Sequence, residues 1–84
     1  MNINVCFVKS GVPINMQAND NMIFAELAWK YFGKVGIDQQ NDQPKFIFNS
    51  KEIKLDGAKT LKELEIRNGS RIEVVLKKDI IGAK

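Results

Sequence analysis

Residues 44–76 carry a dense succession of strand and turn signals, and this succession limits the folds open to the chain. They read PKFIFNSKEIKLDGAKTLKELEIRNGSRIEVVL. A strand over 45–49 leads through Asn49-Ser50 into a short strand over 52–55, and Asn68-Gly69 is a strong turn signal before a last strand that ends at Leu76. Thr60 and Glu63 have the spacing of a capping box, which predicts one helical turn before that last strand.

The first nineteen residues predict a β-hairpin, because apolar and polar residues alternate on both sides of Ser10-Gly11. Pro13 lacks an N–H and belongs at a strand start or a sheet edge. The residues expected to point inward are Ile3, Val5, Phe7, Ile14, Met16 and Ala18.

From Met22 to about Val35 the apolar residues recur at helical spacing, and the helix N-cap is expected within 19–21. The inward arc of this predicted helix is Met22, Phe24, Ala25, Ala28, Trp29, Phe32 and Val35. We expect Trp29 to be buried between helix and sheet. Ile23, Leu27 and Tyr31 lie at the shoulder of the arc, either as the margin of the core or as a second partner surface. Residues 37–44 predict a polar loop.

The predicted order is therefore ββαββ, a short helix and a final β-strand, which indicates an α+β domain of two layers, a β-grasp with a mixed sheet packed on one helix. We expect one domain over 1–78 and a C-terminal tail over 79–84.

Composition narrows the function classes. The net charge of +3 comes from thirteen basic and ten acidic residues that are scattered along the 84-residue chain, so we expect no nucleic-acid partner. No apolar run approaches the ~18–20 residues of a membrane span, and we expect no membrane partner. With one cysteine and no histidine, neither a zinc site nor a catalytic constellation is available. We expect no enzyme and no cofactor, an inert buried thiol at Cys6, and a cytoplasmic or nuclear location.

Strand alternation predicts a binding surface. If Phe46 and Phe48 are core, Ile47 points outward, and Val75 points outward from the last strand for the same reason. Two exposed aliphatic residues are also compatible with an ordinary surface. The full set of predicted protein-binding residues is Ile47, Val75, Lys45, Ser50, Lys51, Glu73 and Lys77.

The chain resembles ubiquitin, most clearly in Phe46-Ile47-Phe48, Asp56-Gly57, the segment 60–66 and the segment 70–76. The resemblance implies a β-grasp that presents a sheet face to protein partners, such as ubiquitin-binding-type domains, or that sits in a larger assembly. Ile80 and Ile81 stand where that family has two glycines, and Glu73 stands where ubiquitin has a histidine.

These features favour a non-conjugated ubiquitin-like interaction module, monomeric in isolation. Two alternatives remain. One is a structural subunit of a multi-protein assembly, and the other is a ubiquitin-like modifier whose mature terminus lies elsewhere. Formation of an ATP-dependent thioester with an activating enzyme would favour the modifier.

Overall fold

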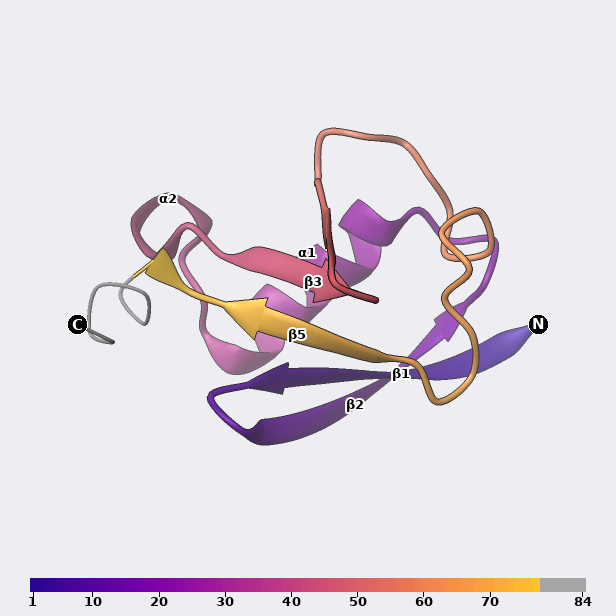
Figure 1. Ribbon diagram of the computed structural model, residues 1–84, viewed down its shortest axis with the longest axis horizontal. Helices are drawn as coiled ribbons and strands as arrows, with labels where there is room; N and C mark the ends of the chain where they lie inside the picture. Colours follow the sequence, from indigo (N-terminus) through magenta and orange to yellow (C-terminus); the bar gives the residue numbers. More distant parts are fainter. Residues whose placement is uncertain (78–84) are drawn as a thin grey trace.

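The computed structural model describes residues 1–77, which form a five-stranded sheet with one long helix packed across one face (Figure 1). This arrangement confirms the predicted α+β fold with a mixed sheet. The predicted tail, 79–84, lies outside the described residues. The elements are β1 (Asn2–Lys9), β2 (Val12–Asn19), α1 (Phe24–Val35), α2 (Gln39–Asp42), β3 (Lys45–Phe48), β4 (Lys51–Ile53) and β5 (Arg71–Val75).

The strands lie in the order β2-β1-β5-β3-β4. β1 and β5 are parallel neighbours in the middle of the sheet, and all other neighbouring pairs are antiparallel. The β1–β2 hairpin closes through Ser10 and Gly11, both with positive φ (51° and 79°), which is the backbone of a two-residue type I′ turn. β5, the last strand of the described residues, therefore joins the first hairpin to the β3–β4 hairpin.

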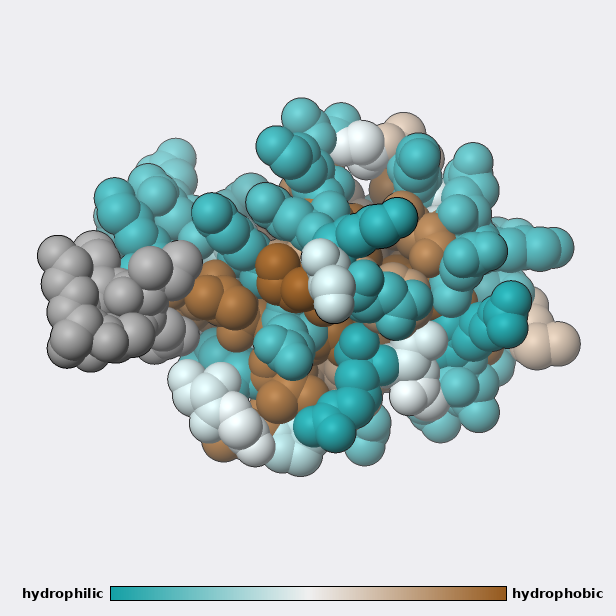
Figure 2. All heavy atoms as spheres, viewed as in Figure 1, coloured by the Kyte–Doolittle hydropathy of each residue, from teal (hydrophilic) through white to brown (hydrophobic). Residues whose placement is uncertain are grey.

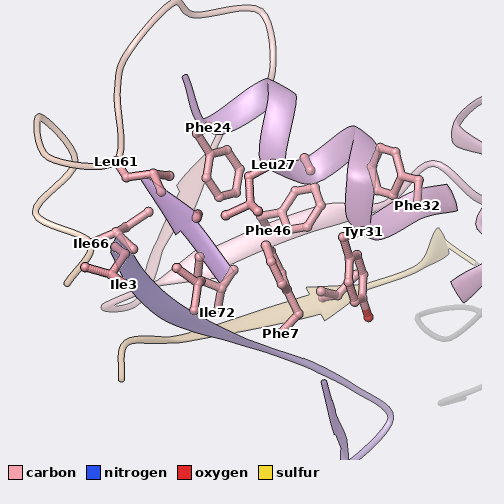
Figure 3. Close-up of a cluster of buried hydrophobic side chains, with 14 of the residues drawn as sticks. Ile3, Phe7, Phe24, Leu27, Tyr31, Phe32, Phe46, Leu61, Ile66 and Ile72 are labelled. Carbon is pink, nitrogen blue, oxygen red and sulfur yellow. The ribbon is translucent and has the colours of Figure 1, made fainter. Parts of the chain in front are cut away.

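The core lies between the sheet and α1, and aromatic rings dominate it (Figure 3). Phe7 stacks on Tyr31 with ring centroids 4.4 Å apart. Phe46 meets Phe24 edge to face at 5.2 Å, one of the arrangements that aromatic pairs prefer. The inward positions predicted for β1 are confirmed, since Ile3, Val5 and Phe7 are buried.

The predicted inward face of the helix was wrong at Trp29, which is 55% exposed. Leu27 and Tyr31, placed at the shoulder of the arc, are fully buried and belong to the core rather than to a second partner surface. Apolar residues occupy so much of the helix circumference that one flank must face water. The helix packs with Leu27 and Tyr31 toward β1, because the Tyr31 ring stacks on Phe7 there, and Trp29 is left on the opposite flank.

The helix also begins later than predicted. Ile23 is the N-cap and makes no side-chain capping bond, while Asn19 Oδ1 accepts the N–H of Asn21 at 2.9 Å and closes a turn before the helix. The end was better predicted, because Gly36 adopts the left-handed conformation (φ 75°) of a helix C-cap.

Two short segments differ from the prediction. Within 37–44, α2 forms because Asp38 caps it, accepting the N–H groups of Gln40 and Asn41. Conversely, 61–65 is a turn rather than a helix. The capping-box contacts are nevertheless present: Glu63 N–H donates to Thr60 Oγ1 at 3.1 Å and Thr60 N–H donates to Glu63 Oε1 at 3.0 Å. The Thr60 N–H and the Thr60 hydroxyl both donate to Glu63 Oε1, and these two hydrogen bonds lower the pKa of the Glu63 carboxyl.

Candidate protein-interaction surface

Among residues 1–77, no helix lies on the face of the sheet opposite α1 (Figure 1). Figure 2 shows this face with hydrophobic side chains along its middle and hydrophilic side chains around them. Side chains along each strand alternate between this face and the core. The outer face is therefore made of the residues in each strand whose side chains point away from the core.

Ile47 and Val75 both lie on this outer face, as predicted, and both are partly exposed. They are diagonal neighbours rather than direct partners. Ile47 pairs with Glu73, and Val75 pairs with Lys45. Diagonal residues in an antiparallel pair are ~7–8 Å apart at their Cα atoms, still within reach of aliphatic side chains.

Val8 extends this apolar centre onto β1, and the sequence prediction missed it. Val8 is the register partner of Glu73 on the side opposite Ile47, and it is partly exposed. We call Val8, Ile47 and Val75 the outer-face patch. The alternation in β1 already pointed Val8 outward, but its place beside β5 depends on the parallel β1–β5 pairing, which no local pattern encodes.

Charged residues surround the patch. Lys45, Glu73 and Lys77 are exposed, as predicted, and Glu73 sits between Val8 and Ile47 in the register. Within 1–77, the salt bridge present joins the Met1 ammonium to Asp20 at 3.2 Å, so no ion pair ties up the Glu73 carboxylate. The patch thus has basic residues and Glu52 at its edge and Glu73 at its centre.

Two predicted rim residues lie differently. Lys51 pairs with Phe48, whose side chain faces inward, so Lys51 shares the helix side of the sheet rather than the outer face. Ser50 is exposed in the two-residue turn before β4, with φ 66°. Glu52, the register partner of Ile47, occupies the outer position instead.

Cys6 also lies on the outer face, where it is partly exposed beside its register partner Arg71. The prediction of a buried thiol was wrong because strand alternation sends Val5 and Phe7 inward and Cys6 outward. Arg71 is exposed and adds a further basic group to this face.

A separate cavity of about 460 Å³ lies on the helix side, between β4 and the segment 54–65. Its apolar lining includes Phe24, Phe48, Ile53 and Leu64. Lys51 lines this cavity, which is consistent with its inward register. Among residues 1–77, no group of histidine, cysteine or carboxylate side chains is arranged to hold a metal ion.

Residues 1–76 match the family described as "Ubiquitin-2 like Rad60 SUMO-like". The chain belongs to this Rad60 SUMO-like family. The match spans every strand of the sheet, from β1 to β5, and it supports the ubiquitin-like character inferred from the residues.

Solved structures show the same fold for this Rad60 SUMO-like chain. The ubiquitin of Caldiarchaeum subterraneum aligns with a TM-score of 0.78 at 12% identity, over 92% of this chain and 95% of that one. The UBL domain of yeast Ddi1 aligns with a TM-score of 0.79 at 14% identity, over 90% of both chains. A crystal structure of ATBAG1 in complex with HSP70 aligns with a TM-score of 0.76 at 19% identity, over 96% of this chain and 46% of that one.

At these identities the structural neighbours establish the ubiquitin-like β-grasp and nothing finer. No curated protein matches the chain. Within the described residues, no helix has the length and hydrophobicity needed to cross a membrane.

Proposed function

We propose that this domain is a non-conjugated, non-enzymatic ubiquitin-like interaction module that binds protein partners through the outer-face patch. The observation that carries the proposal is the register around Glu73, which places Val8 on one side and Ile47 on the other, with Val75 one diagonal step away. Apolar side chains grouped among charged ones can serve as the anchors of a protein interface.

The charges suggest the type of partner. Lys45, Arg71 and Lys77 provide basic groups at the edge of the patch, and Glu73 provides an acidic group at its centre. This surface would be complemented by a partner segment that carries apolar anchors and one basic side chain opposite Glu73. Acidic residues of the partner would lie toward the edge. Such complementarity raises specificity and the association rate more than it raises affinity.

The absence of conjugation is proposed from the sequence. A conjugated tail must be thin and extended to enter an activating enzyme, and Ile80 and Ile81 are bulky β-branched residues at the positions of the family's two glycines. These positions lie outside the described residues, so this part of the proposal depends on the register of the sequence alone.

The patch is tested by Ile47→Ala. Because Ile47 points away from the core, its truncation leaves no internal cavity, and we expect stability to change by no more than about 0.5 kcal/mol. Binding is expected to weaken by roughly 1–2 kcal/mol, since a few central apolar residues provide most of the energy of a small interface. An NMR titration against a panel of ubiquitin-binding domains measures both the affinity and the residues that shift.

Trp29→Ala is the matched control, since it removes a larger exposed side chain from the helix side of the domain. If Ile47→Ala leaves binding unchanged while Trp29→Ala weakens it, the interface is on the helix and the proposal is wrong. Charge reversal at Glu73 is expected to change which partners bind, favouring acidic centres over basic ones, with little effect on the melting temperature.

A second candidate function is a structural subunit of an assembly. The observation that favours it is Trp29 itself, because its side chain is 55% exposed and tryptophan is enriched in protein interfaces. In that case the outer-face patch stays free in the assembly and Trp29 becomes protected from aqueous quenchers.

A further inference from the structure

β2 ends the sheet, and its outer edge has no neighbouring strand among the described residues. Its eight residues, VPINMQAN, include no charged side chain. Edge strands are usually guarded by charged side chains, by bulges or by proline, because their unpaired N–H and C=O groups can recruit another strand. Here Pro13 is the one such guard within β2, near its beginning.

The hairpin geometry fixes which backbone groups face outward. Lys9 and Val12 are the closing pair of the two-residue turn, so Val12 directs its N–H and C=O toward β1. Every second residue does the same, and the amide of Asp20 accordingly donates to the Met1 carbonyl. The residues between them, Asn15, Gln17 and Asn19, direct their backbone groups away from the sheet.

We propose that a second copy of this chain adds to this edge, with the two β2 strands antiparallel about a two-fold axis at Met16. In this register Asn15 of one copy faces Gln17 of the other, and Pro13 faces Asn19. Pro13 has no N–H to donate, and the Asn19 carbonyl already accepts the Met22 N–H at 2.9 Å. The N–H that Pro13 lacks would therefore lie opposite the Asn19 carbonyl, which already has a donor. The other outward N–H and C=O groups of the two strands would pair with one another.

The side chains fit the same register. On the helix side, Met16 would contact Met16 of the second copy, and Ile14 would lie against Ala18. Ile14 and Met16 are only partly buried in one copy, so pairing would cover apolar surface that now faces water. On the outer side, the amides of Asn15 and Gln17 would face each other. A symmetric contact brings identical surfaces together, and an uncharged strand avoids the repulsion that like charges would cause.

The groove beside this edge is also compatible with self-association. Glu26 and Lys30 of α1 line it together with Gln17 and Ala18. The one carboxylate and the one ammonium of the groove balance in charge. The groove of one copy therefore does not repel the groove of the other. Edge pairing leaves the sheet faces free, and the dimer would carry two outer-face patches on one continuous sheet. The proposal does not depend on the proposed function, and it replaces the expectation of a monomer in isolation.

Sedimentation equilibrium tests the proposal on the full chain. A single strand-to-strand contact belongs to the small class of interfaces, and we expect the average mass to rise toward twice the monomer mass as protein approaches about 1 mM. Asn15→Pro is expected to abolish this rise, because it removes an outward donor and places a ring against the second copy. It should preserve the fold, since the Asn15 N–H makes no bond to β1 and proline is tolerated at such edge positions.

Asn15→Ala is the matched control: it removes the side chain but keeps the N–H, and it should still dimerise. Amide exchange gives a residue-level readout, in which the amides of Asn15, Gln17 and Asn19 become protected as concentration rises. A chain that stays monomeric up to about 1 mM overturns the proposal. So does a dimer that survives Asn15→Pro, or one that protects amides of β4 instead; protection that needs an added peptide would assign the edge to a different occupant.

Discussion

Tyr31 combines complete burial with an unsatisfied hydroxyl. Its side chain is 0% exposed, and its Oη has no hydrogen-bond partner among the described residues. A buried polar group without a partner costs roughly 1–3 kcal/mol. Tyr31→Phe keeps the ring that stacks on Phe7, and we expect it to stabilise the domain by roughly 1 kcal/mol. For a domain of this size, that raises the melting temperature by roughly 4–8 °C.

The same burial makes stability depend on alkaline pH. Desolvation raises the pKa of the Tyr31 phenol above its ordinary value of 10.0. Above pH 10 the unfolded chain loses this proton while the folded chain keeps it, so stability falls as pH rises through the folded pKa. Tyr31 is the chain's one tyrosine, and the absorbance of tyrosinate follows it alone. The Tyr31→Phe variant has no phenol and should be destabilised less at alkaline pH than the parent protein. Titration of the Tyr31 phenol at its ordinary pKa would contradict the prediction.

Trp29, the chain's one tryptophan, should have the fluorescence of a side chain in water rather than of one in the core. Because it is 55% exposed, its fluorescence maximum is expected near that of free tryptophan, with ready quenching by acrylamide. Trp29→Ala is expected to change stability by no more than about 0.5 kcal/mol, far less than the ~3–5 kcal/mol expected for a buried tryptophan. A blue-shifted fluorescence maximum that moves to the red on unfolding would instead show that Trp29 is buried.

At the scale of elements, Asn68 ties β1 to the turn that precedes β5. Its Oδ1 accepts the Asn4 N–H at 2.8 Å, and the Gly69 N–H donates to the Asn4 carbonyl at the same distance. Both backbone groups of one β1 residue are thus held by one turn. Gly69 has φ 86°, a conformation that suits glycine.

Removing the Asn68 acceptor should weaken the parallel β1–β5 pairing. We expect Asn68→Ala to destabilise the domain by about 0.5–1.5 kcal/mol, the usual value of one hydrogen bond. Asn68→Asp keeps an oxygen at the same position and should lose less. Chemical denaturation of both variants measures the difference, and equal losses would show that the side-chain oxygen makes no specific contribution.

The strands were predictable from sequence because each side chain in them has one of two directions. Alternation alone placed Phe7 inside and Ile47 outside, and the structure agrees for both. The face of α1 was harder to predict, because its apolar residues extend around both flanks and only the aromatic cluster on the sheet selects Tyr31 over Trp29. α2 was missed because it has no apolar face and depends on the Asp38 cap.

The candidate surface was predictable only in part, for a related reason. Ile47 and Val75 follow from alternation within each strand. Val8 joins them through the pairing of β1 with β5, strands more than sixty residues apart in the chain. Lys51 was misplaced because β4 begins at Lys51 rather than at residue 52. Lys51 therefore pairs with Phe48 across the two-residue turn and shares its inward direction.

At the scale of the whole molecule, β5 is the last strand of the described residues and lies in the middle of the sheet. It lies between β1 and β3, and it supplies the buried residues Ile72 and Val74. Without it the sheet consists of two separate hairpins, and a two-stranded hairpin is marginally stable at best in water.

This position also determines when the protein can fold in the cell. A ribosome adds residues from the N-terminus onward, so β1, β2 and α1 emerge long before the strand that completes their sheet. Contacts between distant parts of a chain are also slow to form, because the intervening loop must close first. Until Val75 has left the exit tunnel, the rings of Phe7 and Phe24 lack the strand that completes their core, and exposed apolar surface of this kind favours aggregation.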